Sequence, residues 1–129
     1  MEDKYVVNGI KRRMTEDDFE NYDLVFSCVD SMTFRKTLYE YGWTKDNGKL
    51  FWIDGRCTSR SGALFNSDLS KESLLPFVND SKEEGGCLLA FEKEENISHT
   101  LPTIVAGMMV QTFLNKIRGE KTSRMIFTV

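Results

Sequence analysis

The sequence predicts a single-domain α/β protein with a mixed sheet, and three observations carry that prediction. Its 129 residues, 40% of them hydrophobic and 29% charged, suffice for one hydrophobic core but not for two. The near-continuous apolar run at residues 24–29 is typical of a strand covered on both faces, and a helical pattern follows it. A second apolar run, at residues 50–53, comes after a turn signal. Alternation of this kind indicates strands connected through helices.

The first elements are short. Residues 5–7 (Tyr-Val-Val) predict an edge strand, which the Asn8-Gly9 turn signal closes. Thr15 stands three residues before Asp18, the spacing of a capping box, and predicts a helical turn that ends near Tyr22.

The strand at residues 24–29 organises the chain. Asp30 ends it, and Ser31 offers a hydroxyl cap to a helix expected over residues 31–41. The apolar stripe of that helix has helical spacing, and Gly42 is expected to end the helix as its C-cap. The stripe consists of Phe34, Leu38 and Tyr41.

The second apolar strand, residues 50–53, is expected to stop at Asp54, with a return strand at residues 62–65. Residues 67–86 predict a long connection with one short helix or strand around residues 74–78. A fourth strand is expected at residues 87–91, a helix at 100–118 with Gly119 just beyond it, and a last strand at 125–129.

Charge and hydropathy exclude several classes of function. A net charge of −3 with scattered basic residues argues against a nucleic-acid partner, and the single basic run at residues 11–13 is expected to be a solvated surface. The richest apolar segment, residues 101–110, is about half the length that crosses a bilayer, which argues against a membrane partner. The charged start of the sequence lacks a signal-peptide pattern, so we expect a cytoplasmic protein.

Motifs for phosphate and metal binding are scarce. Neither G-x-G-x-x-G nor G-x-x-x-x-G-K-[ST] occurs, so the sequence shows no obvious phosphate cradle. The one histidine, His99, is expected to be a surface or capping residue rather than a catalytic base. With one histidine and no C-x-x-C pair, the sequence offers few ligands for a zinc site.

A family resemblance begins at the organising strand. The segments Asp23-Leu-Val-Phe-Ser-Cys-Val-Asp30-Ser-Met-Thr-Phe-Arg35-Lys-Thr-Leu38, Phe51-Trp-Ile-Asp-Gly and Ser61-Gly62-Ala-Leu-Phe resemble the second half of the ThiF-like domain of ubiquitin-activating enzymes. That family has a strand reading roughly D-x-V-x-D-x-x-D-N, a helix with an arginine, and a glycine-bearing return strand. The resemblance is strongest over residues 23–65. It implies the C-terminal half of a Rossmann-type ThiF-like fold, without the glycine-rich first half.

The resemblance also implies an activity and a site. Family members use ATP and magnesium to adenylate the C-terminal glycine of a ubiquitin-like protein or sulfur carrier. By position, Asp30 matches the magnesium-binding aspartate and Arg35 matches the arginine of the following helix. A hard cation that bridges phosphates prefers such an oxygen ligand. Two simpler interpretations stay open: Asp30 caps the helix, and Arg35 pairs with Glu40 or stays solvated.

The cysteines give one further candidate. Where the family has a catalytic cysteine, it belongs to the long connection before the closing helix, and Cys87 is nearest to that region. A buried, structural Cys87 is the stronger interpretation because Cys87 opens an expected strand. Cys28 is expected in the core, and Cys57 in a polar loop.

Three hypotheses about function follow. In the first, the chain is a truncated, non-catalytic ThiF-like module that associates with itself or with a complete homologue, because a half-sheet exposes an edge and apolar surface. In the second, it is an active adenylating subunit whose phosphate-binding half comes from another chain. A third, weaker hypothesis is an unrelated small α/β protein. ATP and magnesium are expected as cofactors only under the second.

Overall fold

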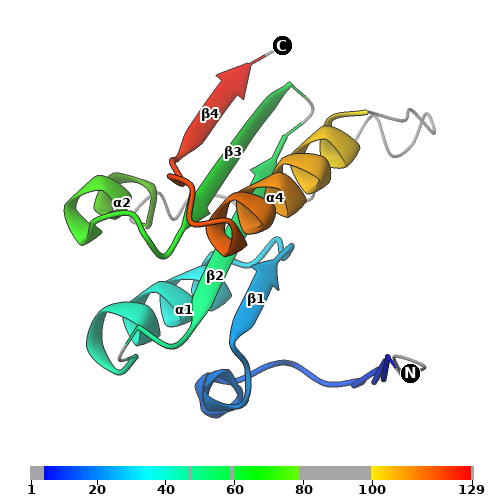
Figure 1. Ribbon diagram of the computed structural model, residues 1–129, viewed down its shortest axis with the longest axis vertical. Helices are drawn as coiled ribbons and strands as arrows, with labels where there is room; N and C mark the ends of the chain where they lie inside the picture. Colours follow the sequence, from blue (N-terminus) through cyan, green and yellow to red (C-terminus); the bar gives the residue numbers. More distant parts are fainter. Residues whose placement is uncertain (1–4, 47, 59, 79–99, 129) are drawn as a thin grey trace.

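The computed structural model describes residues 5–46, 48–58, 60–78 and 100–128 (Figure 1). It is a single α/β domain built on a four-stranded mixed sheet. The elements in chain order are the 3-10 helix η1 (Glu16–Asn21), β1 (Leu24–Ser27), α1 (Met32–Thr44), β2 (Phe51–Cys57), β3 (Ser61–Asn66), α2 (Lys71–Val78), α4 (Leu101–Ile117) and β4 (Met125–Thr128).

The strands lie in the order β1-β2-β3-β4. β1 and β2 are parallel, with Ser27 opposite Asp54, and α1 makes the connection between them. β3 and β4 add antiparallel strands, with Arg56 of β2 opposite Ala63 and Gly62 opposite Phe127. The sheet is therefore mixed, as the sequence predicts.

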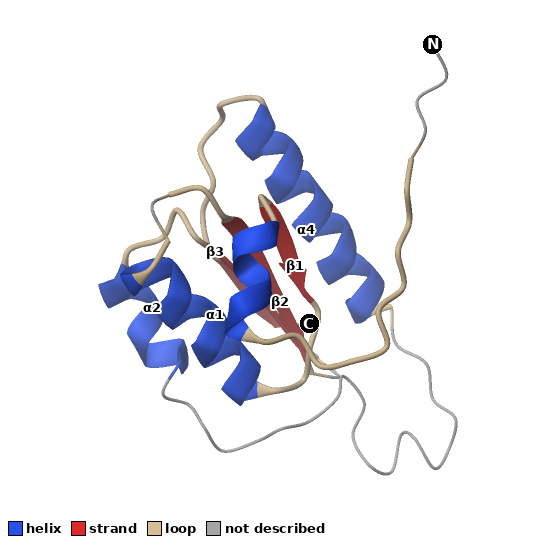
Figure 2. Cartoon of the chain, turned by 90° about the horizontal axis from the view of Figure 1, so that it is seen from below, coloured by secondary structure: helices blue, strands red, loops and turns tan. Residues whose placement is uncertain are grey.

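Helices cover both faces of the sheet. α1 and α2 lie on one face and α4 lies on the other (Figure 2). The larger core cluster is on the α1 side and is rich in aromatic rings, including Tyr39 stacked on Trp52 at 4.4 Å between centroids. The smaller cluster joins β2 and β3 to α4 and consists of Ile53, Leu64, Val105 and Met109.

Two strand glycines let α4 approach the sheet. A Cβ atom added at Gly55 would lie 2.3 Å from Met109 Sδ, and one added at Gly62 would lie 3.0 Å from Val105 Cγ2. The backbone at these positions is covered directly by the helix, which explains why β2 and β3 carry glycine on the α4 face.

Local signals are confirmed at several element ends. The Ser31 hydroxyl accepts a hydrogen bond from the Phe34 amide at 3.2 Å and caps α1. The capping box of Thr15 and Asp18 opens η1. α4 begins at Leu101 with proline in its first turn, and Gly119 follows its end with φ of 72°.

Other boundaries differ from the expectation. Gly42 was expected to end α1 but lies inside it, and the close packing of Trp52 accounts for the glycine, because a Cβ built there would lie 2.9 Å from the indole nitrogen. Residues 5–7 form no strand. β2 continues past Ile53 to Cys57, so Asp54 lies within the strand rather than at its end. The strand expected at 87–91 lies outside the described residues.

Candidate functional site

The nucleotide site that the resemblance implies would lie beside the C-terminal end of β1. Asp30 is exposed in the connection between β1 and α1, so its carboxylate is open to solvent. It does not cap the helix, because Ser31 does. A single exposed carboxylate can supply one oxygen ligand to a magnesium ion that is otherwise held by phosphates.

Arg35, the second predicted residue, is buried and turned into the fold. Its Nε donates to Asp54 Oδ1 at 3.0 Å, and its Nη1 contacts Met32 Sδ at 3.6 Å. Nη2 donates to the carbonyl oxygens of Val29 and Gly55. All the guanidinium nitrogens therefore have protein partners, and the expected pairing with Glu40 or solvent is wrong.

Asp54 is the centre of a buried polar cluster. Its carboxylate has no solvent exposure and accepts hydrogen bonds from Arg35, from Arg56 Nε at 2.9 Å and from the Tyr39 hydroxyl at 2.6 Å. We call Arg35, Tyr39, Asp54 and Arg56 the Asp54 cluster. Arg56 extends it, because Nη2 donates to the Tyr39 hydroxyl and Nη1 to the Phe77 carbonyl, each at 2.9 Å. The cluster connects α1, β2 and α2.

Tyr39 and Arg56 are both held in their protonated forms within the Asp54 cluster. Burial, and after it the charge of Asp54, raises the pKa of Tyr39 far above its usual value, so the phenol stays a donor. Burial lowers the pKa of Arg56, but Asp54 and Tyr39 outweigh that effect and the net shift is upward. A general acid or base works best with a pKa near the operating pH. We therefore assign the cluster a structural role.

Sequence reasoning missed Tyr39 and Arg56. One signal was present: residues 52, 54 and 56 alternate along β2, which places Asp54 and Arg56 on the same face as Trp52. The early end assigned to the strand hid this alternation.

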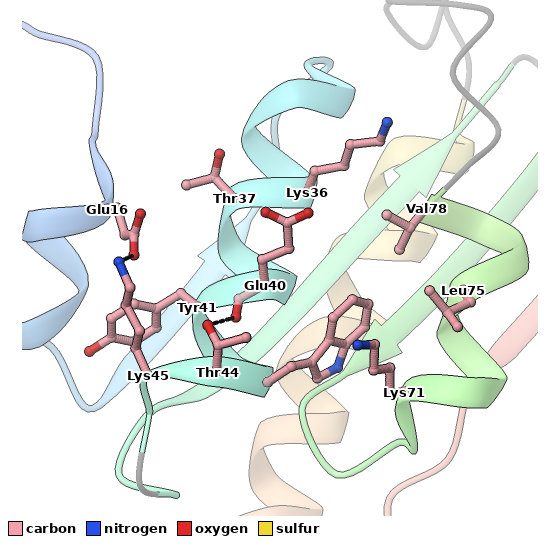
Figure 3. A pocket seen from close by; sticks show the side chains of 11 residues that line it. Glu16, Lys36, Thr37, Glu40, Tyr41, Thr44, Lys45, Lys71, Leu75 and Val78 are labelled. Carbon is pink, nitrogen blue, oxygen red and sulfur yellow. Dashed lines mark hydrogen bonds and ion pairs between the residues drawn. The ribbon is translucent and has the colours of Figure 1, made fainter.

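A groove of about 490 Å³ lies on the outer side of α1, facing α2 and η1 (Figure 3). Lys45 forms an ion pair with Glu16 at one side of it, and Lys71 Nζ lies 5.2 Å from the centre of the Trp43 ring at the other. Neither Asp30 nor Arg35 lines this groove. Its mixed charges give it no single preference for a ligand.

The cysteines are placed differently from the expectation. Cys28 follows the end of β1 and is exposed rather than in the core, because the chain has already left the sheet at that point. The thiol is still partly desolvated by the residues around it, and this effect, followed by the charge of Asp54, raises the pKa of Cys28 and disfavours the reactive thiolate. Cys57 is half-buried as the last residue of β2, not in a loop. The candidate nucleophile Cys87 and His99 lie outside the described residues.

An apolar surface lies along the outer side of β1. The Phe26 ring packs edge-on against Phe113 of α4 at 6.0 Å between centroids, yet 41% of the residue is exposed. Val110 and Ile117, which are 51% and 62% exposed, share a helical stripe with Phe113. We call Phe26, Val110, Phe113 and Ile117 the β1–α4 patch. The sequence analysis did not find it, because it forms only where α4 meets the sheet edge.

Among the described residues, Asp30 and Arg35 are the two that the resemblance offers to magnesium and ATP. The described part of the chain contains no group of three or more histidine, cysteine, aspartate or glutamate side chains that could hold a metal ion. Asp30 is an exposed carboxylate, and Arg35 is hydrogen-bonded to Asp54. The arginine that the resemblance assigns to the nucleotide is thus hydrogen-bonded inside the fold.

Comparison with protein-family models, curated proteins and solved structures found no match to this chain. Among the helices of the described ranges, none has the length and apolar character needed to cross a membrane.

Proposed function

We propose that this chain is a ThiF-like module, incomplete as an adenylating enzyme, that acts in the cytoplasm by associating with a second copy or with a complete ThiF-like homologue. The observation that carries the proposal is the outer edge of β1. Within the described residues β1 pairs only with β2, and the β1–α4 patch lies exposed beside it.

An open edge of this kind favours association. Parallel strands are normally covered on both faces and flanked by neighbours, and an unpaired edge offers backbone groups to another chain. The apolar side chains of the β1–α4 patch add surface that gains free energy when it is removed from water. In a ThiF-like fold the strands of the first half would belong to the same sheet.

The hydrogen bonds of Arg35 support the proposal that the chain is incomplete as an adenylating enzyme. The Arg35 nitrogens are taken up by Asp54, Met32 and two backbone carbonyls. Releasing it toward a phosphate would leave the Asp54 charge buried with one partner fewer, which is costly.

A second candidate function is an ATP- and magnesium-dependent adenylating subunit that activates the C-terminus of a ubiquitin-like or sulfur-carrier protein. The exposed position of Asp30 favours it, since a carboxylate beside the carboxyl end of β1 is where such a site would need an oxygen ligand. This alternative requires another chain to supply the phosphate-binding half, and it predicts ATP binding only with that partner.

Calorimetric titration with ATP and magnesium, with light scattering of the same sample, tests the proposal. We expect no heat of binding from the chain alone and a mass above that of the monomer. ATP binding that disappears in Asp30→Ala but persists in the control Asp23→Ala would overturn the proposal, because the chain would then form a nucleotide site by itself.

A further inference from the structure

The chain begins its described part with an extended apolar arm. Residues 5–13, which we call the N-terminal arm, form no helix or strand and run away from the body of the domain (Figures 1 and 2). Tyr5, Val6 and Val7 are 89%, 79% and 92% exposed, and Ile10 is also exposed. Apolar side chains gathered in one segment and left in water favour a contact with another surface.

The base of the N-terminal arm is held firmly. Arg12 donates to both carboxylate oxygens of Asp18, at 2.8 and 2.6 Å, and the Thr15 amide donates to the same carboxylate at 2.7 Å. The hydrogen bonds from Arg12, and next the one from the Thr15 amide, hold the pKa of Asp18 well below its usual range. Phe19 then enters the core. The arm therefore leaves the domain from a base that is hydrogen-bonded to η1.

The β1–α4 patch is a surface that this arm can cover. Val110, Phe113 and Ile117 repeat at three- and four-residue spacing, a stripe about 10 Å long at 1.5 Å per residue. An extended segment of residues 5–10 spans about 20 Å at most. The arm is therefore long enough to lie along the whole patch.

Charge favours the β1 edge of the sheet, beside which the patch lies, over the β4 edge. The arm carries the exposed cations Lys11 and Arg13, and exposed carboxylates flank the start of β1 at Asp17, Glu20 and Asp23. The chain between α4 and β4 has more exposed cations than carboxylates, with Arg118, Lys121 and Arg124 against Glu120. Opposite charges attract the arm to the β1 side, whereas like charges disfavour the β4 side.

We infer that the N-terminal arm of one copy docks on the β1–α4 patch of a second copy, which returns its own arm in the same way. Reciprocal exchange gives a two-fold symmetric dimer in which each chain contributes one arm and one patch. It also doubles the apolar surface that a single arm would bury. The inference rests on the proposed function, because it names the partner that covers the β1 edge.

Light scattering over a range of concentrations tests the inference on the full chain. The arm variant is Val6→Asp with Val7→Asp, and the patch variant is Val110→Lys with Ile117→Lys. Each substitution replaces an exposed side chain and leaves the core intact. We expect the wild type to be a dimer. Each variant should raise the dissociation constant of the dimer about tenfold or more, because a charge would be buried against an apolar surface.

Mixing the variants distinguishes exchange between copies from other contacts. The arm variant keeps an intact patch and the patch variant keeps an intact arm, so an equal mixture should form a heterodimer held by one arm–patch contact. Two controls, Ile104→Lys on another face of α4 and Ile126→Lys on β4, should leave the mass unchanged. Circular dichroism confirms that each variant is folded.

Three outcomes would overturn the inference. One is a monomeric wild type at every concentration. The second is a dimer that the arm variant leaves intact while the patch variant breaks it, in which case association through β1 stands and only the arm is excluded. The third is dissociation by Ile126→Lys and not by the patch variant, which would move the interface to β4. A monomeric wild type would also exclude the second copy as the partner in the proposed function and leave only the complete homologue. ATP binding by the chain alone is the separate result that would overturn the proposed function itself.

Discussion

Arg35 Nε donates to Asp54 Oδ1 at 3.0 Å across a separation of 19 positions in the chain. The pair joins the first turns of α1 to the middle of β2 and buries both charges. Arg56 and Tyr39 complete the hydrogen bonding of the carboxylate. The βαβ unit is thus fastened by a polar cluster beneath α1 as well as by apolar packing.

Replacing Asp54 tests how strongly this cluster supports the fold. Asp54→Asn keeps the shape but leaves two guanidinium groups without their buried counter-charge, so we expect a loss of about 3–5 kcal/mol in the free energy of unfolding. Urea denaturation followed by circular dichroism measures it. Asp23→Asn is the matched control, because the Asp23 side chain is 85% exposed and its ion pair with Lys49 is long, at 3.7 Å. Its effect should stay within about 0.5 kcal/mol, and an equal effect of the two changes would contradict a special role for Asp54.

Alkaline pH should act on Tyr39. In the unfolded chain a tyrosine loses its proton near pH 10, whereas burial and Asp54 keep Tyr39 protonated in the folded chain. Above about pH 10 the unfolded state therefore binds fewer protons, and the free energy of unfolding falls as the pH rises. Tyr39→Phe should flatten this decline, and Tyr22→Phe should not, because Tyr22 is exposed. Identical alkaline profiles for all three proteins would contradict the assignment.

Two glycine substitutions should change the free energy of unfolding in opposite directions. Gly55→Ala places a methyl group against Met109 Sδ and Val105 Cγ1, and we expect it to cost about 1–3 kcal/mol through overpacking. Gly107→Ala adds a methyl group in open space within α4, and we expect a gain of about 0.5–1 kcal/mol from the lower flexibility of alanine. Thermal unfolding of both variants measures the difference. A neutral Gly55→Ala would mean that α4 does not lie directly on β2.

The Cys28 thiol should react slowly with alkylating reagents. Its pKa is raised by burial and by the charge of Asp54, and the thiolate is the reactive form. Iodoacetamide labelling of Cys28, followed by peptide mass spectrometry, should reach its half-maximal rate at a higher pH in the folded chain than in urea. The same midpoint in both states would show that the fold does not perturb this thiol.

The sequence alone determined the elements whose signals are local. The Ser31 cap, the capping box of Thr15 and Asp18, and the limits of α4 depend on residues within a turn or two of each other, and the structure confirms them. The α/β class follows from the same local patterns. Tertiary structure decided the rest. Gly42, for example, lies inside α1 at a position where the Trp52 indole leaves no room for a side chain, and local sequence does not show this packing.

The partners of charged groups were likewise decided by the tertiary structure. Arg35 had a nearby acid at Glu40 and none of the sequence patterns pointed to Asp54, because that pairing depends on the register of β1 against β2 and on which face of β2 looks toward α1. The β1–α4 patch arises in the same way, from the placement of α4 over the sheet edge. Local sequence sets helices, caps and turns, whereas the burial of a charge and the exposure of an apolar surface are properties of how those elements pack.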